Sequence, residues 1–185
     1  MKLGVIVAST RPGRVGFPVA EWFVGAAKAH GKFDVTLLDL KEIALPLFDE
    51  PKHPRLAQYE HEHTKRWSAL VKAQDAFVVV TPEYNFMAPP ALVNAFDFLY
   101  GEWHYKAIGF VSYGGIAAGA RAVVHAKSMA TTLKMMPMFE GVSLPFFTNQ
   151  IKDGKFEPTP QNEQAATTML DELLKWSGAL KTLRA

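Results

Sequence analysis

Residues 3–18 read LGVIVASTRPGRVGFP and contain the first strand pattern of the chain. Its apolar run, Leu3–Val7, is not interrupted by polar residues and passes directly into a loop of small, hydroxylated and basic residues. Such a run is typical of a strand that is covered on both faces of a parallel sheet. Further strand patterns follow at residues 33–38, 76–80, 107–111 and 140–144. The sequence therefore predicts five strands.

Helical patterns separate these strands. They lie at residues 19–27, 67–71, 90–98, 118–133 and 169–176. Alternating strands and helices indicate right-handed βαβ units. We therefore expect an α/β fold with a doubly wound five-stranded parallel sheet, strand order 2-1-3-4-5 and helices on both faces. Residues 1–185 should form a single domain, since domains commonly contain roughly 100–200 residues.

Composition excludes several classes of function. The formal net charge is only +2, so the chain lacks the basic field of a nucleic-acid-binding protein. The absence of cysteine excludes disulfides, thiolate metal sites and cysteine nucleophiles. His53, His61 and His63 lack the i, i+4 spacing of helical metal ligands, so we expect no metal site. No signal peptide or membrane span is visible, which favours a cytoplasmic protein without a membrane partner.

In the predicted strand order, ligands bind beyond the carboxyl ends of the strands that end at residues 7, 80 and 111. The loop at residues 8–18 leads into a helix start, where free backbone N–H groups favour an anion. Ser9, Thr10, Arg11 and Arg14 add hydroxyl and guanidinium donors. The loop therefore predicts a phosphate monoester site, and the alternative is a surface loop with two solvated arginines.

The loops after the third and fourth strands are also unusual. The loop at residues 81–90 carries Tyr84, Phe86 and Met87, which suit a planar heterocycle. Alternatively, Tyr84 and Phe86 cap the core, or Phe86 and Met87 lie in a dimer interface. In the loop at residues 112–119, Gly114 and Gly115 leave backbone N–H groups available to a heterocycle edge. We expect all three loops to meet in one pocket.

Four short motifs resemble the NADPH-dependent FMN reductase family, which includes quinone, azo-compound and chromate reductases. They are STR at 9–11, PEYN at 82–85, SYGG at 112–115 and GARA at 119–122. The resemblance implies a flavodoxin-like fold, FMN as cofactor, and NADPH or NADH as co-substrate. It places the FMN phosphate on the first loop and the flavin ring on the other two. The cofactor-binding residues expected from the loops and the resemblance are Ser9, Thr10, Arg11, Arg14, Val15, Gly16, Phe17, Pro82, Glu83, Tyr84, Asn85, Ser112, Tyr113, Gly114 and Gly115.

The implied reaction is ping-pong hydride transfer through flavin N5 to a small acceptor such as a quinone. The flavin carries this chemistry, so no side chain is assigned as catalytic, and Tyr84 and Asn85 are the nearest candidates. The alternatives are a flavodoxin-like electron carrier and a nucleotide-binding scaffold without turnover. The acceptor, the preference for NADPH or NADH, and whether FMN is bound tightly or exchanges all remain open.

The resemblance also implies a homodimer or homotetramer, assembled through the helix that follows the PEYN motif. That helix and the residues after it are rich in apolar side chains, which we expect to be exposed in a monomer. They are Leu92, Phe96, Phe98, Leu99 and Tyr100.

Overall fold

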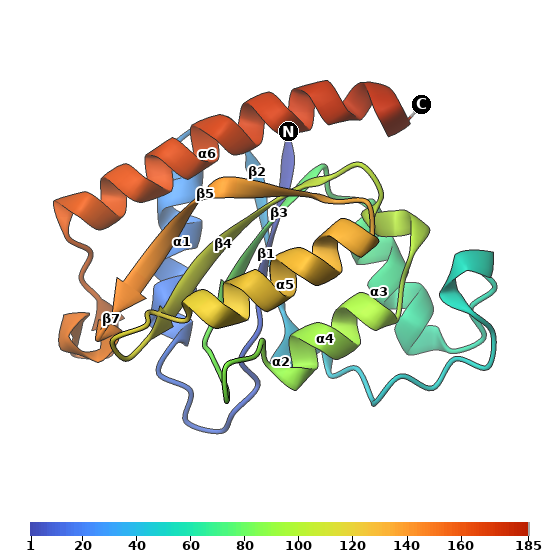
Figure 1. The fold of residues 1–185 in the computed structure, drawn as a ribbon, viewed down its shortest axis with the longest axis horizontal. Coiled ribbons are helices and arrows are strands. Elements are labelled where there is room, and N and C mark those ends of the chain that lie inside the picture. Colours follow the sequence, from blue (N-terminus) through green and yellow to red (C-terminus); the bar gives the residue numbers. More distant parts are fainter. Residues whose placement is uncertain (185) are drawn as a thin grey trace.

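The structure, a computed structural model, describes residues 1–184. Its main sheet has five parallel strands in the order β2-β1-β3-β4-β5 (Figure 1). Their bounds are β1 Lys2–Val7, β2 Asp34–Asp39, β3 Ala76–Thr81, β4 Ala107–Gly114 and β5 Met136–Pro145. The predicted fold class and strand order are confirmed.

Helices cover both faces of this sheet (Figure 1). The α-helices are α1 Phe17–Ala29, α2 Leu40–Ile43, α3 Glu62–Lys72, α4 Pro90–Asp97, α5 Ala120–Thr132 and α6 Pro160–Lys181. Helices α1 and α6 pack on one face, and α3, α4 and α5 pack on the other. Sequence analysis missed α2, the hairpin of β6 Ile151–Lys152 and β7 Lys155–Phe156, and four short 3-10 helices at Pro54–Leu56, Gly101–Trp103, Phe147–Gln150 and Thr182–Arg184.

The unbroken apolar runs supply a core on each side of the sheet. Along β3, Val78 and Val80 pack toward α1 and α6, whereas Phe77 and Val79 pack toward the opposite helices. On that opposite side Trp103 is fully buried and contacts the rings of Trp67, Phe77 and Phe96. The central strand is therefore covered on both faces, and its carboxyl end is presented at one edge of the sheet.

Two local predictions were wrong. Helix α5 begins at Ala120 rather than Ala118, because Ala118 and Gly119 have left-handed φ values of 51° and 78°. His61 lies outside α3 as its N-cap, in extended conformation, so its ring stacks on that of His63 with centroids 5.2 Å apart. The two imidazoles thus approach each other, although helical spacing predicted that they would diverge. His63 Nε2 lies 2.9 Å from Asp49 Oδ1.

The predicted exposure of the segment after the PEYN motif was also wrong. Helix α4 ends at Asp97, and Phe98 and Leu99 turn inward. Leu92, Phe96, Phe98 and Leu99 are all at most 1% exposed, because they fill the core beneath α3 and α4, whereas Tyr100 is partly exposed. The four buried side chains therefore offer no surface to a second subunit.

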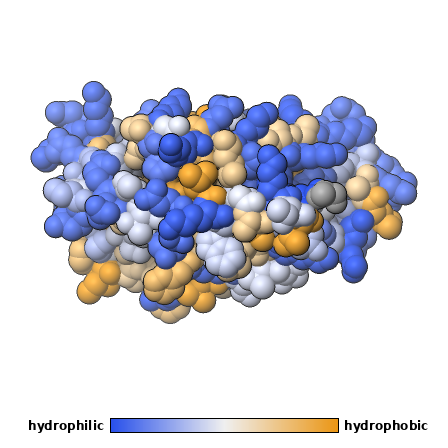
Figure 2. Space-filling view, turned by 90° about the horizontal axis from the view of Figure 1, so that it is seen from above, coloured by the Kyte–Doolittle hydropathy of each residue, from blue (hydrophilic) through white to orange (hydrophobic). Residues whose placement is uncertain are grey.

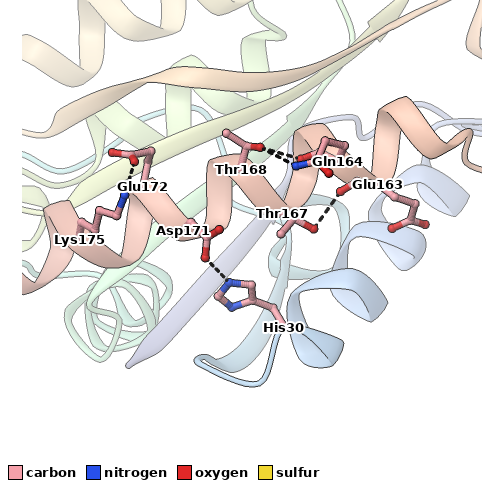
Figure 3. A network of polar contacts seen from close by, with 8 residues as sticks. All are labelled: His30, Glu163, Gln164, Thr167, Thr168, Asp171, Glu172 and Lys175. Carbon is pink, nitrogen blue, oxygen red and sulfur yellow. Dashed lines mark hydrogen bonds and ion pairs between the residues drawn. The ribbon is translucent and has the colours of Figure 1, made fainter.

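Helix α6 closes the fold against α1. Thr159 and Asn162 form a capping box at its start, and farther along Asp171 Oδ1 lies 3.1 Å from His30 Nε2 (Figure 3). Seen from the side on which α6 lies, hydrophilic side chains cover much of the molecule, with apolar side chains in smaller groups between them (Figure 2). Within residues 1–184 no helix combines the length and apolar character needed to cross a bilayer.

Candidate functional site

The loop between β1 and α1 begins at Ala8, whose N–H donates to Val80 O at 3.0 Å and extends the pairing of β1 with β3. Ser9 is 3% exposed, and its hydroxyl lies 3.0 Å from the hydroxyl of Tyr84 in a hydrogen bond that joins the first loop to the second. The loop enters α1 at Gly16, and no side chain caps this helix start. The first N–H groups of α1 are therefore available to an anion.

Arg14 stabilises the first loop from within. Its guanidinium pairs with both carboxylate oxygens of Asp39 at the end of β2 and donates to Ser9 O at 2.7 Å. The two charged side chains are only 10% and 8% exposed. Hydrogen bonding to Asp39 raises the pKa of Arg14 above its already high ordinary value, so the guanidinium is charged. Arg14 is therefore largely committed to a buried ion pair, which holds the loop against the sheet.

The second loop contains a tight turn. Tyr84 and Met87 exchange two backbone hydrogen bonds of 3.0 and 2.9 Å. Between them Asn85 and Phe86 have φ values of 50° and 70°, a left-handed pair that is characteristic of a type I′ turn. Phe86 and Met87 are 64% and 49% exposed, so they do not cap the core. The turn projects from the edge of the sheet.

The third loop is held close to the first by a tight contact. A Cβ added to Gly16 would lie 2.0 Å from Tyr113 Oη, so the ring of Tyr113 packs directly on the start of α1. Tyr113 is 4% exposed and also contacts the ring of Phe147, with centroids 4.6 Å apart. Burial raises the pKa of the Tyr113 phenol, which therefore stays protonated at neutral pH.

A cavity of about 340 Å³ lies where the three loops meet, and we name it the loop cavity. It is lined by Ser9, Arg11, Gly13, Arg14, Val15, Gly16, Pro82, Glu83, Tyr84, Tyr113, Gly114 and Phe147. A wider hollow of about 900 Å³, the outer hollow, lies beside it over the start of α4. Arg11, Glu83 and Tyr84 line both spaces and form the wall between them.

Five of the predicted site residues do not line the loop cavity. Asn85 lines the outer hollow. Thr10 lines a separate space of about 420 Å³ against α2 and α4. Phe17 lies under the Arg14 guanidinium, at 4.7 Å from the ring centroid. Ser112 is 1% exposed on β4, and Gly115 O accepts from Phe146 N just beyond the end of β5.

Sequence reasoning did not single out Asp39, Phe147 or Arg121 at this site. Asp39 is the last residue of β2 and Phe147 lies two residues beyond β5, so both stand at carboxyl ends of strands, the same positional signal that identified the three loops. Arg121 lies in the first turn of α5 and pairs with Glu83. This pairing lowers the pKa of Glu83, so its carboxylate is charged. Only the GARA motif pointed toward Arg121.

Comparison with known proteins agrees with this geometry. A sequence profile described as NADPH-dependent FMN reductase matches residues 1–149. An NAD(P)H-dependent FMN reductase of Schizosaccharomyces pombe is 36% identical over 186 residues, covering 98% of this chain and 90% of that protein. One from a Nectria species is 30% identical over 193 residues, covering 98% and 96%.

Among solved structures, FerB, a flavoenzyme NAD(P)H:(acceptor) oxidoreductase from Paracoccus denitrificans, superposes with a TM-score of 0.77 at 19% identity. The superposition covers 96% of this chain and 97% of that one. At such low identity the likeness concerns the fold, which is flavodoxin-like.

Proposed function

This chain belongs to the NADPH-dependent FMN reductase family, and from that premise we propose that it reduces quinones or similar small acceptors in a ping-pong cycle on FMN held in the loop cavity. It is an oxidoreductase that uses FMN with NAD(P)H as electron donor. The observation that carries the proposal is the convergence of the loops after β1, β3 and β4 on one cavity beside an open hollow.

The residues present fit the phosphate end of FMN. The start of α1 has no side-chain cap, so its N–H groups near Val15, Gly16 and Phe17 would bind phosphate oxygens. Arg11 lines the loop cavity, and among the described residues it has no ion-pair partner. Arg11 would therefore supply the charge-assisted bond to the phosphate, while Arg14 holds the loop.

The loops after β3 and β4 fit the flavin ring of FMN. Pro82, Tyr84 and Gly114, from these loops, line the loop cavity. Tyr84 is oriented by its hydrogen bond to Ser9, and the turn places Asn85 at the outer hollow. FMN supplies hydride acceptance and donation when it is bound. The chain contributes binding, orientation and restricted water access, without a side-chain acid or base.

The outer hollow fits the two substrates in turn. Met87, Ala88, Pro90 and Val93 give it a largely apolar lining that suits a planar quinone or a nicotinamide ring. Its width favours alternate occupation, first by NAD(P)H and then by the acceptor. We infer broad acceptor use, because the outer hollow is wide and open and would leave one face of the flavin ring accessible.

A purified sample tests the proposal directly. We expect flavin absorbance after incubation with FMN, and rapid NAD(P)H oxidation when a quinone is added. Arg11→Ala should weaken FMN binding roughly 10- to 150-fold in a fluorescence titration, because a charge-assisted bond contributes roughly 1.5–3 kcal/mol. Arg66→Ala, which changes an exposed arginine on α3, is the matched control. Unchanged affinity in Arg11→Ala would remove Arg11 from the phosphate site.

The same assay separates the alternatives. Bound flavin without NAD(P)H oxidation would indicate an electron carrier, and failure to take up flavin would indicate a scaffold. We further propose a homodimer or homotetramer. Because the side chains of α4 that were expected at the subunit interface are buried, this proposal is supported instead by exposed apolar side chains near the outer hollow. These are Leu47 (85% exposed), Phe86 (64%), Met87 (49%) and Phe48 (41%). Light scattering after size exclusion measures the assembly, and a monomer at micromolar concentration would contradict it.

A further inference from the structure

The Glu83 carboxylate joins the second loop to α5. Its oxygens accept from the backbone N of Arg121 at 3.0 Å and from Arg121 Nε at 2.6 Å, and the side chain is only 9% exposed. Helix α5 has no side-chain cap of its own, because Gly119 occupies the N-cap position. A carboxylate at this point satisfies free N–H groups and interacts favourably with the helix dipole. Glu83 therefore caps α5 from a different loop.

Arg121 also contacts the turn that follows Glu83. Its guanidinium carbon lies 3.8 Å from the centroid of the Phe86 ring. Phe86 has a φ of 70° and its side chain is 64% exposed, so the core does not hold this residue. A residue other than glycine in left-handed conformation costs of order 1 kcal/mol and persists only when its surroundings hold it. The stack on Arg121 supplies one such contact.

We propose that Arg121 is a positioning residue that fixes the turn at residues 84–87 by pairing with Glu83 and stacking on Phe86. Through this turn it sets the wall between the loop cavity and the outer hollow. Arg121 lines neither space, so it acts through its two partners. The inference rests on the proposed function, since this wall is where the flavin ring would meet the substrates.

The geometry requires arginine rather than lysine. One flat group binds Glu83 along its edge through Nε and contacts the Phe86 ring with its face. An ammonium group keeps the charge but has neither the planar face nor the fork of donors. Arg121→Lys should therefore recover only part of what Arg121→Ala loses, whereas a purely electrostatic role would be recovered fully.

Hydrogen exchange in flavin-free protein tests the positioning itself. The amides of Tyr84 and Met87 are bonded across the turn, and Arg121→Ala should speed their exchange roughly 5- to 30-fold, because a partly exposed ion pair and a cation–π contact are lost. Glu83→Gln should act in the same direction and serves if Arg121→Ala does not fold. Lys175→Ala breaks a more exposed ion pair, with Glu172 on α6, and is the control. Unchanged exchange at Tyr84 and Met87 overturns the proposal.

Turnover of FMN-loaded protein tests whether the position of this turn affects reduction of the acceptor. Arg121→Ala should lower kcat/KM for the acceptor roughly 5- to 30-fold, because the same contacts are lost. The dissociation constant of FMN should change less than about threefold, because the phosphate contacts remain. An unchanged kcat/KM, or an equal loss in Lys175→Ala, overturns the proposal. If wild-type protein takes up no FMN, the proposed function fails, while the exchange measurement still decides whether Arg121 holds the turn.

Discussion

Gly16→Ala tests whether the contact between the first and third loops builds the flavin site. Gly16 has φ −85° and ψ −8°, a conformation with negative φ that residues other than glycine also adopt, so the main loss should come from contacts of the added methyl group. That methyl would lie 2.0 Å from Tyr113 Oη and 2.1 Å from Cζ. The Tyr113 ring must therefore move by more than about 1 Å to reach van der Waals distance.

The ring has little room to move, because it is 4% exposed and packs on Phe147. Overpacking of this kind typically costs about 1–3 kcal/mol. We expect a melting temperature lower by roughly 2–12 °C, from about 2–4 °C per kcal/mol in a chain of this size. If the clash instead distorts the loop cavity without lowering stability, the same cost should appear in FMN affinity, which should fall roughly 5- to 150-fold at about 1.4 kcal/mol per factor of ten.

Two measurements check this reasoning, a thermal melt without flavin and a fluorescence titration with FMN. Tyr113→Phe should not rescue Gly16→Ala, because Cζ stays in the path of the methyl group, whereas the shorter side chain of Tyr113→Leu should relieve the clash. Gly25→Ala, in the same helix with no heavy atom within 4 Å of its new methyl, is the matched control and should leave FMN affinity unchanged. A Gly16→Ala protein with wild-type melting and wild-type affinity refutes the argument.

Three further changes address other parts of the structure. Asp39→Asn leaves the buried Arg14 without its counter-ion, so the free energy of unfolding in urea should fall by about 3 kcal/mol; a loss below about 1 kcal/mol would mean that the pair does not hold the loop. Gly119→Ala forces a left-handed alanine whose Cβ meets Tyr113 O at 3.0 Å, so about 1–3 kcal/mol should be lost, and an unaltered melting temperature would argue against it. Lys106 is 5% exposed, donates to Val71 O at 2.8 Å, and has its pKa lowered by burial from 10.5 to about 8. Below pH 8 both folded and unfolded chains carry the proton; between pH 8 and 10.5 only the unfolded chain keeps it, so Lys106 should add up to about 3 kcal/mol to stability across that window. Lys106→Met should lack this rise when the two proteins are unfolded in urea at pH 7.5 and 10, and parallel pH profiles would contradict it.

The sequence predicted the loop cavity because topology alone brings the carboxyl ends of neighbouring parallel strands together. The apolar runs ending at Val7, Val80 and Val111 located that edge, and Ser9, Tyr84 and Tyr113 meet there. The partners that each side chain contacts were less predictable. Arg14 was expected to bind the phosphate, but its guanidinium forms an ion pair with the carboxylate of Asp39, which lies 25 residues away at the end of β2. Pairings of this kind depend on the exact approach of two loops, which periodicity does not encode.

The error over Phe98 and Leu99 has a different cause. The segment from residue 90 to 100 is apolar nearly all round, and such a pattern does not reveal which face is buried. In the structure α4 ends at Asp97 and the chain turns, so Phe98 meets Phe48 and Leu99 enters the core near Trp103. The position of the helix end, rather than the apolar content, decides what surface remains for a partner.

The charges at the site explain why the loop cavity suits an anion although acidic groups lie beside it. Asp39 is neutralised by Arg14, and Glu83 is neutralised by Arg121. Each carboxylate is at most 9% exposed and is paired with an arginine, so it leaves little net field at the cavity. Arg11 and the uncapped start of α1 are then the positive groups at the cavity that no carboxylate among residues 1–184 compensates. A phosphate completes this arrangement, whereas removal of Arg14 would expose the Asp39 carboxylate to it. The Arg14–Asp39 pair thus favours FMN binding without touching its phosphate, because it removes the repulsion that would otherwise oppose it.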